Sequence, residues 1–116
     1  MRYSAKLIFQ YRVMVKGNPG KRRLCEDRIV LIDAGDAESA YEEAIIKGKK
    51  AEHDYLNSEE NRVYFEFIGI SDLLHLGAEC ESDEVWYDIR ERLLPKENKK
   101  KIIPTKRQLL KSRSIE

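Results

Sequence analysis

Apolar and polar residues alternate with a period of two at the start of the chain. The apolar residues that fall on one face of an extended chain here are Tyr3, Ala5, Leu7, Phe9, Tyr11, Val13 and Val15. Polar residues dominate the other face. Strict alternation of aromatic and β-branched residues is typical of a long strand with one buried face. The pattern therefore predicts a strand over residues 3–15.

A cluster of turn-forming residues separates this strand from a second one. The segment KGNPGKRR (16–23) contains two glycines, an asparagine and a proline, which favour tight turns. From Leu24 to Ala34 the sequence becomes strand-like again, around the apolar centre IVLI at 29–32. We therefore expect an antiparallel hairpin around a basic loop.

A helical pattern follows the hairpin. Asp36 is placed to accept hydrogen bonds from the amides of a first helical turn. A stripe of small and aromatic residues then recurs at steps of three, four or seven: Ala37, Ala40, Tyr41, Ala44, Gly48, Ala51 and Tyr55. Because the stripe is built from small side chains, we expect this helix to lie close against a sheet, with Gly48 packed against a strand.

Two more strands complete the predicted fold. Residues 62–76 are apolar-rich, with Gly69 as a bend or bulge, and residues 84–93 follow a polar loop at 77–83. The order β-β-α-β-β predicts an α+β fold: a four-stranded antiparallel sheet with one helix packed on one face. Residues 1–94 form this α+β domain.

The remaining residues, 95–116, form a basic C-terminal tail. Thr105 and Gln108 fit a capping box, so residues 105–113 are expected to contain a short helix. Only a few apolar residues (Ile102, Ile103, Leu109 and Leu110) are available to anchor the tail. We therefore expect its removal to leave the sheet folded, at a cost of no more than about 1 kcal/mol.

Several segments of residues 2–93 resemble a known family. They are RYSAKL (2–7), IDA (32–34), DAESAYEEA (36–44), Glu52-His53 with Tyr55 and Asn57, FIGI (67–70) with Asp72-Leu73, and Glu84-Val85 with Tyr87. The family is one of small bacterial proteins known as domain of unknown function number 4288. The resemblance implies a compact α+β domain and supplies no activity or catalytic residue.

Charge is distributed unevenly along the chain although the net charge is only +1. The tail holds eight basic and two acidic residues, whereas residues 1–94 hold 14 basic and 19 acidic ones. No stretch approaches the roughly 18 apolar residues of a spanning helix. The first residues do not form a signal peptide, and two distant cysteines make no disulfide framework. We therefore expect a cytoplasmic protein that does not enter a membrane.

Candidate catalytic and metal-binding residues are scattered. No two of the candidate metal ligands lie closer than five positions in the sequence, so no metal site is expected. These candidates are Cys25, His53, His75 and Cys80. The helix carboxylates Glu38, Glu42, Glu43, Glu52 and Asp54 are expected on a solvated face. The segment GNPGK (17–21) precedes a strand rather than a helix, and no serine lies in a Gly-x-Ser-x-Gly turn. The sequence predicts neither a cofactor nor an enzyme.

The function expected on these grounds is that of a small non-catalytic protein-interaction module. One helix covers one sheet face, and Ile8, Met14 and Trp86 fall on the other, which favours a homodimer or a protein partner there. The alternative is a nucleic-acid-associated protein that uses the hairpin loop and tail. The residues that would make these contacts are Lys16, Lys21, Arg22, Arg23, Lys99, Lys100, Lys101, Lys106, Arg107, Lys111 and Arg113.

Overall fold

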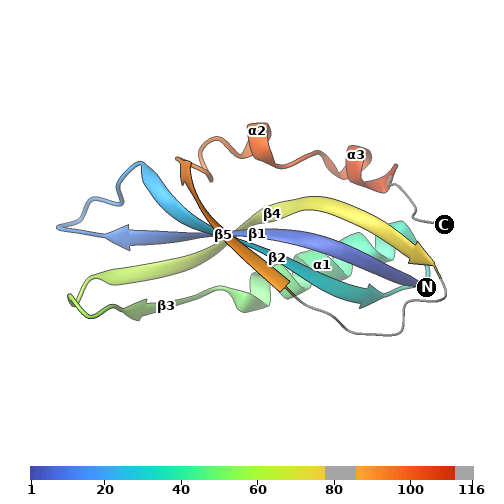
Figure 1. Cartoon of the computed structure of the whole chain (residues 1–116), viewed down its shortest axis with the longest axis horizontal. Coiled ribbons are helices and arrows are strands. Elements are labelled where there is room, and N and C mark those ends of the chain that lie inside the picture. The colour runs from blue at the N-terminus through green and yellow to red at the C-terminus, as the bar shows by residue number, and fades with distance from the viewer. Residues whose placement is uncertain (78–85, 112–116) are drawn as a thin grey trace.

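The protein is built on one antiparallel sheet with the strand order β3-β4-β1-β2-β5, shown in Figure 1. The computed structural model describes residues 1–77 and 86–111. The elements are β1 (Arg2–Met14), β2 (Arg22–Asp33), α1 (Ala37–Ala51), β3 (His53–Leu56), β4 (Arg62–Gly77), β5 (Trp86–Leu93), α2 (Lys99–Ile102) and α3 (Lys106–Leu110). The predicted α+β class is confirmed. The described part has five strands and three helices, however, instead of four strands and one helix.

β1 is the central strand and forms the predicted hairpin with β2. The register pairs Arg2 with Asp33 and Phe9 with Glu26, while the other edge of β1 pairs along β4. Tyr3, Leu7 and Phe9 are buried in the main core beneath α1. The period of two in the sequence therefore marks the face of β1 that packs against the helix.

α1 begins as the sequence predicts and packs closely on the sheet. The side chain of Asp36 caps it, with Oδ1 accepting a hydrogen bond of 2.7 Å from the Ser39 amide. Gly48 is buried, and a Cβ atom at this position would lie only 2.5 Å from Cε1 of Phe67 on β4. The expected packing of Gly48 against a strand is confirmed.

The helix ends earlier than its residue spacing predicts. Ala51 is its last residue, and Tyr55, which we expected on the helical stripe, lies in the short strand β3. β3 pairs antiparallel with β4, from His53 opposite Phe65 to Leu56 opposite Arg62. Asn57 closes the turn between them, because its Oδ1 accepts hydrogen bonds from the amides of Glu59 and Asn61.

β4 and β5 lie at the predicted positions. The pairing of β4 with β1 is irregular beside Gly69, since Phe9 pairs with Phe67 and Ile8 pairs with Gly69. β5 pairs with β2, from Leu93 opposite Arg22 to Trp86 opposite Ile29. The predicted loop beyond Gly77 and the first two residues expected in the last strand lie outside the described residues, as does the Trp86 side chain.

The start of the tail packs on the face of the sheet opposite α1, whereas α3 lies beside α1, where Lys106 pairs with Glu38 and Glu42. Ile102 and Ile103 pack against a second buried cluster formed by Ile8, Cys25 and Ile68. The expectation that Ile8 lies on an uncovered face is therefore wrong, because the tail covers it.

The second tail helix reaches the main core. Leu109 of α3 is buried among the residues beneath α1. The predicted capping box of Thr105 and Gln108 is confirmed, with the Thr105 hydroxyl accepting from the Gln108 amide. Residues 112–116, part of the expected helix at 105–113 among them, lie outside the described residues. None of the described helices has the length and apolar character needed to cross a membrane.

Candidate functional site

α1 covers only part of the sheet face against which it packs. Its 15 residues span about 22 Å at 1.5 Å per residue, whereas the 13 residues of β1 span about 44 Å. The helix packs over the first half of β1, from Tyr3 to Phe9. The second half of β1, and the neighbouring ends of β2, β3, β4 and β5, extend beyond the helix. We call the α1-side surface of this end the distal face.

Large apolar side chains are exposed on the distal face. Val15, Leu24, Tyr55 and Leu93 are exposed by 49%, 53%, 40% and 54%, respectively. Val13, Val15 and Arg22 line a hollow of about 370 Å³ there. Leu93 lies opposite Arg22 in the sheet register, which places it beside this hollow. Tyr55 and Leu93 lie in the two edge strands, β3 and β5, and Val15 and Leu24 flank the β1–β2 hairpin loop between them.

The same end of the sheet carries a second group of aromatic and polar side chains. The His53 ring lies 5.1 Å from Phe65 and 5.9 Å from Tyr55, which places both β3 residues on the α1 side. The Tyr11 hydroxyl donates a hydrogen bond of 3.3 Å to Glu26. Burial is the main reason that the pKa of Tyr11 is raised, and the Glu26 carboxylate adds to it.

Two ion pairs lie on the strands of the distal face. Arg28 donates a hydrogen bond of 2.7 Å from Nε to Glu26, and its guanidinium group lies over the Phe9 ring at 4.9 Å. Arg22 and Glu91 form an ion pair of 3.6 Å at the rim. This end of the sheet therefore combines exposed apolar groups with paired charges of both signs.

The opposite face of the sheet holds a connected network of polar side chains. The Glu66 carboxylate accepts hydrogen bonds from Arg12 Nε at 2.7 Å and Gln10 Nε2 at 2.8 Å. The Arg12 bond is the main cause that lowers the Glu66 pKa from 4.5 to about 2. Gln10 in turn accepts from Arg23 at 3.1 Å, and Arg23 binds Glu97 of the tail. This network attaches the tail to the sheet.

The residues predicted to contact nucleic acid divide into two groups. Arg23 is only 4% exposed and binds Glu97, while Lys106 binds Glu38 and Glu42, so these two cations are engaged internally. The remaining described members are exposed: Lys16, Lys21, Arg22, Lys99, Lys100, Lys101, Arg107 and Lys111. Arg113 lies outside the described residues.

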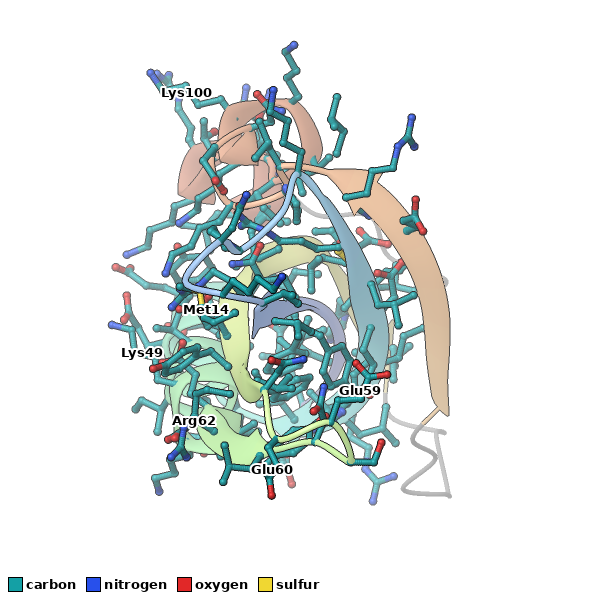
Figure 2. All side chains as sticks on the ribbon, turned by 90° about the vertical axis from the view of Figure 1, so that its left-hand side faces the viewer. Met14, Lys49, Glu59, Glu60, Arg62 and Lys100 are labelled. Atoms are coloured by element: carbon teal, nitrogen blue, oxygen red, sulfur yellow. The ribbon has the colours of Figure 1, made fainter. Side chains whose placement is uncertain are left out.

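The hairpin loop and the tail meet at one end of the sheet. The Leu94 amide, just after β5, donates to the Lys21 carbonyl oxygen, and Arg23 donates to the Gly20 carbonyl as well as to Glu97. Two basic segments that are far apart in sequence are thereby brought together. Figure 2 shows this end of the molecule, with Lys100 pointing away from the sheet.

A groove of about 640 Å³ lies between α1, the edge of β4 and the tail. Phe67 and Ile70 contribute to its lining, together with Lys49 and Lys99 and the carboxylates Glu42 and Glu52. Glu52 also caps the strand edge, since its Oε2 accepts a hydrogen bond of 3.0 Å from the Phe67 amide. The groove is thus lined by side chains of both charges, and one backbone amide of the β4 edge is hydrogen-bonded to Glu52.

The candidate metal ligands do not converge in the described part of the chain. Cys25 is buried under the tail, His53 stacks near Phe65, and the His75 ring lies 5.1 Å from Tyr3. Across residues 1–77 and 86–111, no three His, Cys, Asp or Glu side chains are placed to hold an ion together. Cys80 lies outside these ranges.

Sequence reasoning did not single out the distal face. Leu24 and Leu93 each read as an ordinary member of a strand, and Tyr55 was assigned to the helix. A signal was nevertheless present, because a helix of about 15 residues is too short to cover strands of 12 or 13. Comparing these lengths would have indicated an uncovered end.

Comparison with known proteins identifies a family. The model of the family described as "Domain of unknown function (DUF4288)" matches residues 2–85, so β5 and the tail lie beyond the matched range. No curated protein and no solved structure matches the chain.

Proposed function

The chain belongs to the DUF4288 family, and from this premise we propose that it is a small non-catalytic protein-interaction module that binds a second copy of itself through the distal face. The observation that carries the proposal is that Val15, Leu24, Tyr55 and Leu93 are all exposed at the end of the sheet that α1 does not cover. Exposed apolar side chains gathered on one surface are typical of interaction sites.

Charge supports a second copy as the partner. In a two-fold contact each surface meets itself, so an excess of either charge would produce repulsion. On the distal face Arg28 is paired with Glu26 and Arg22 with Glu91. The strands of the distal face therefore present paired charges to a second copy, and the exposed Lys16 and Lys21 lie at the rim, in the hairpin loop.

The roles of the buried charged groups support a non-catalytic module. General acid–base catalysis needs an ionisable group that is available to a substrate. Glu66, Arg23 and Glu26 are buried or partly buried, and each is held by hydrogen bonds to neighbouring side chains. Their bonds serve to join strands and to attach the tail.

Sedimentation equilibrium of the full chain and two matched variants tests the proposal. Leu24→Glu places a charge on the distal face, whereas Ile46→Glu places the same charge at a residue of α1 that is 46% exposed. We expect the wild type and Ile46→Glu to approach twice the 13.6 kDa of one chain. Leu24→Glu should weaken self-association about tenfold or more, because the contact would bury its carboxylate.

Two results would overturn this function. One is a wild-type mass of 13.6 kDa throughout the micromolar range. The other is an equal loss of association in both variants, which would show that the added charge acts without regard to its position.

A further inference from the structure

The packed tail presents an apolar side to the sheet and a basic side to solvent. Ile102, Ile103 and Leu109 are directed into the two buried clusters. The exposed cations of the tail are Lys99, Lys100, Lys101, Arg107 and Lys111, and exposed Lys21 of the hairpin lies at the start of the tail, where its carbonyl oxygen accepts a hydrogen bond from the Leu94 amide. We call these six residues the basic ridge. None of them takes part in an ion pair within the described part of the chain.

The acidic side chains beside the ridge are already occupied. Glu97 accepts two hydrogen bonds from Arg23, of 2.9 and 3.0 Å, and Glu66 is bound by Arg12 and approached by Lys96 at 3.6 Å. The ridge therefore keeps its positive charge although residues 1–94 are acidic overall. The fold therefore keeps the positive charge of the ridge apart from the negative charge of residues 1–94.

We propose that the basic ridge binds the phosphate backbone of double-stranded nucleic acid without reading its sequence. A row of exposed Lys and Arg gains affinity for a polyphosphate by releasing the counterions condensed on it. Because the tail is fixed to the sheet through Ile102, Ile103 and Glu97, the segment that carries these lysines is already in place before a ligand arrives. This site goes beyond the self-association proposed above and uses a different surface.

The composition of the ridge selects a duplex over two other polyanions. It contains no aromatic side chain on which unpaired bases could stack, so it lacks the main contact of single-strand binding. An anionic membrane is disfavoured because surface-bound basic segments also insert apolar side chains into lipid. Here those side chains face the protein, and none of the described large apolar residues that are exposed belongs to the tail.

Fluorescence anisotropy with the full chain tests this inference through two triple variants of equal charge. Lys99→Gln, Lys100→Gln and Lys101→Gln together remove three charges from the ridge. Lys47→Gln, Lys49→Gln and Lys50→Gln remove three exposed charges from α1 and serve as the control. The probes are DNA and RNA duplexes of about 20 base pairs in two unrelated sequences, and a single strand of the same length. A thermal melt of each variant checks that it is folded.

We expect the wild type to bind both duplex sequences equally and more tightly than the single strand. The ridge variant should bind about tenfold or more weakly, and its slope of log affinity against log salt concentration should fall by about 2 to 3. The α1 variant should stay within about twofold of the wild type. Leu24→Glu should still bind, which separates this site from the distal face.

Four outcomes would overturn the inference. In the first, the wild type fails to bind either duplex at about 50 mM salt, and in the second, both triple variants lose the same amount of duplex affinity. In the third, the wild type binds the single strand more tightly than the duplex, and in the fourth, it binds phosphatidylserine vesicles more strongly than the duplex. The last result would assign the ridge to a lipid surface.

Discussion

Arg23 on β2 and Glu97 in the tail lie 74 positions apart, yet their side chains are joined by two hydrogen bonds of 2.9 and 3.0 Å. The guanidinium group of Arg23 is buried, whereas the Glu97 carboxylate is half exposed. The pair fixes the start of the tail at the base of the β1–β2 hairpin. It thereby attaches the segment that leads into α2 to the sheet.

Replacing Glu97 should therefore destabilise the fold. Glu97→Gln leaves the buried Arg23 charge without its ionic partner, and we expect a loss of about 2 kcal/mol in the free energy of unfolding. The matched control is Glu91→Gln, because Glu91 forms an exposed ion pair with Arg22 and should cost no more than about 0.5 kcal/mol. Urea unfolding measures both values. Equal losses would mean that the Arg23–Glu97 pair has no special structural role.

Leu109 should contribute to stability as a core residue does, so the cost of about 1 kcal/mol that the sequence predicts for removing the whole tail is too low. Leu109→Ala removes a buried side chain that packs beneath α1, so we expect a loss of about 2 to 4 kcal/mol. Leu56→Ala, at an exposed position of β3, should change stability by no more than about 0.5 kcal/mol. Calorimetric or urea unfolding distinguishes them. A Leu109→Ala variant as stable as the wild type would show that the tail is dispensable.

The packing of α1 on β4 depends on the absence of a side chain at Gly48. At a solvent-exposed position inside a helix, Gly→Ala would stabilise the folded protein by about 1 kcal/mol. At Gly48, however, the new Cβ would lie 2.5 Å from the Phe67 ring. We expect Gly48→Ala to destabilise by about 1 to 3 kcal/mol. Gly35→Ala has no atom within 4 Å of its new Cβ and should be nearly neutral. A stabilised Gly48→Ala variant would contradict the close packing.

Glu66 should make stability depend on pH in the acid range. Its folded pKa of about 2 lies below the ordinary 4.5, chiefly because Arg12 donates a hydrogen bond to the charged form. The unfolded chain therefore takes up a proton at a higher pH than the folded chain. The stabilisation is complete above pH 4.5 and is lost as the pH falls toward 2.

The Glu66→Gln variant isolates this contribution. The wild type should exceed it by about 2 kcal/mol at pH 7, and the difference should shrink as the pH falls from about 5 to about 2. Urea titrations at several pH values measure the difference. A difference that is independent of pH would contradict the assigned role of the carboxylate.

Local signals were enough to predict several elements of this fold. Alternation along β1, the Asp36 cap of α1 and the Thr105–Gln108 capping box each depend on neighbouring residues, and each is confirmed. β3 was missed for the opposite reason. Tyr55, one of its four exposed residues, continues the helical spacing of Ala51, and only pairing with β4 makes this segment a strand. A contact between distant segments leaves no local pattern.

The location of the tail and of the distal face also depends on distant contacts. The sequence identifies Ile102 and Ile103 as apolar residues that could anchor the tail. It does not indicate that they pack against Ile8 and Cys25. Leu24 looks like any strand residue until the end of α1 is compared with the end of β1. The interaction surface proposed here therefore follows from the relative lengths of two elements rather than from a motif.

The most direct test of the central claim is an isotope-filtered NOE experiment on a mixture of labelled and unlabelled full-length chains. This measurement detects contacts between copies and identifies the residues that make them. We predict intermolecular NOEs to the methyl groups of Val15, Leu24 and Leu93, and none to Ile46 on α1. Intermolecular NOEs confined to other surfaces, or none at concentrations where the wild type sediments as a dimer, would contradict self-association through the distal face.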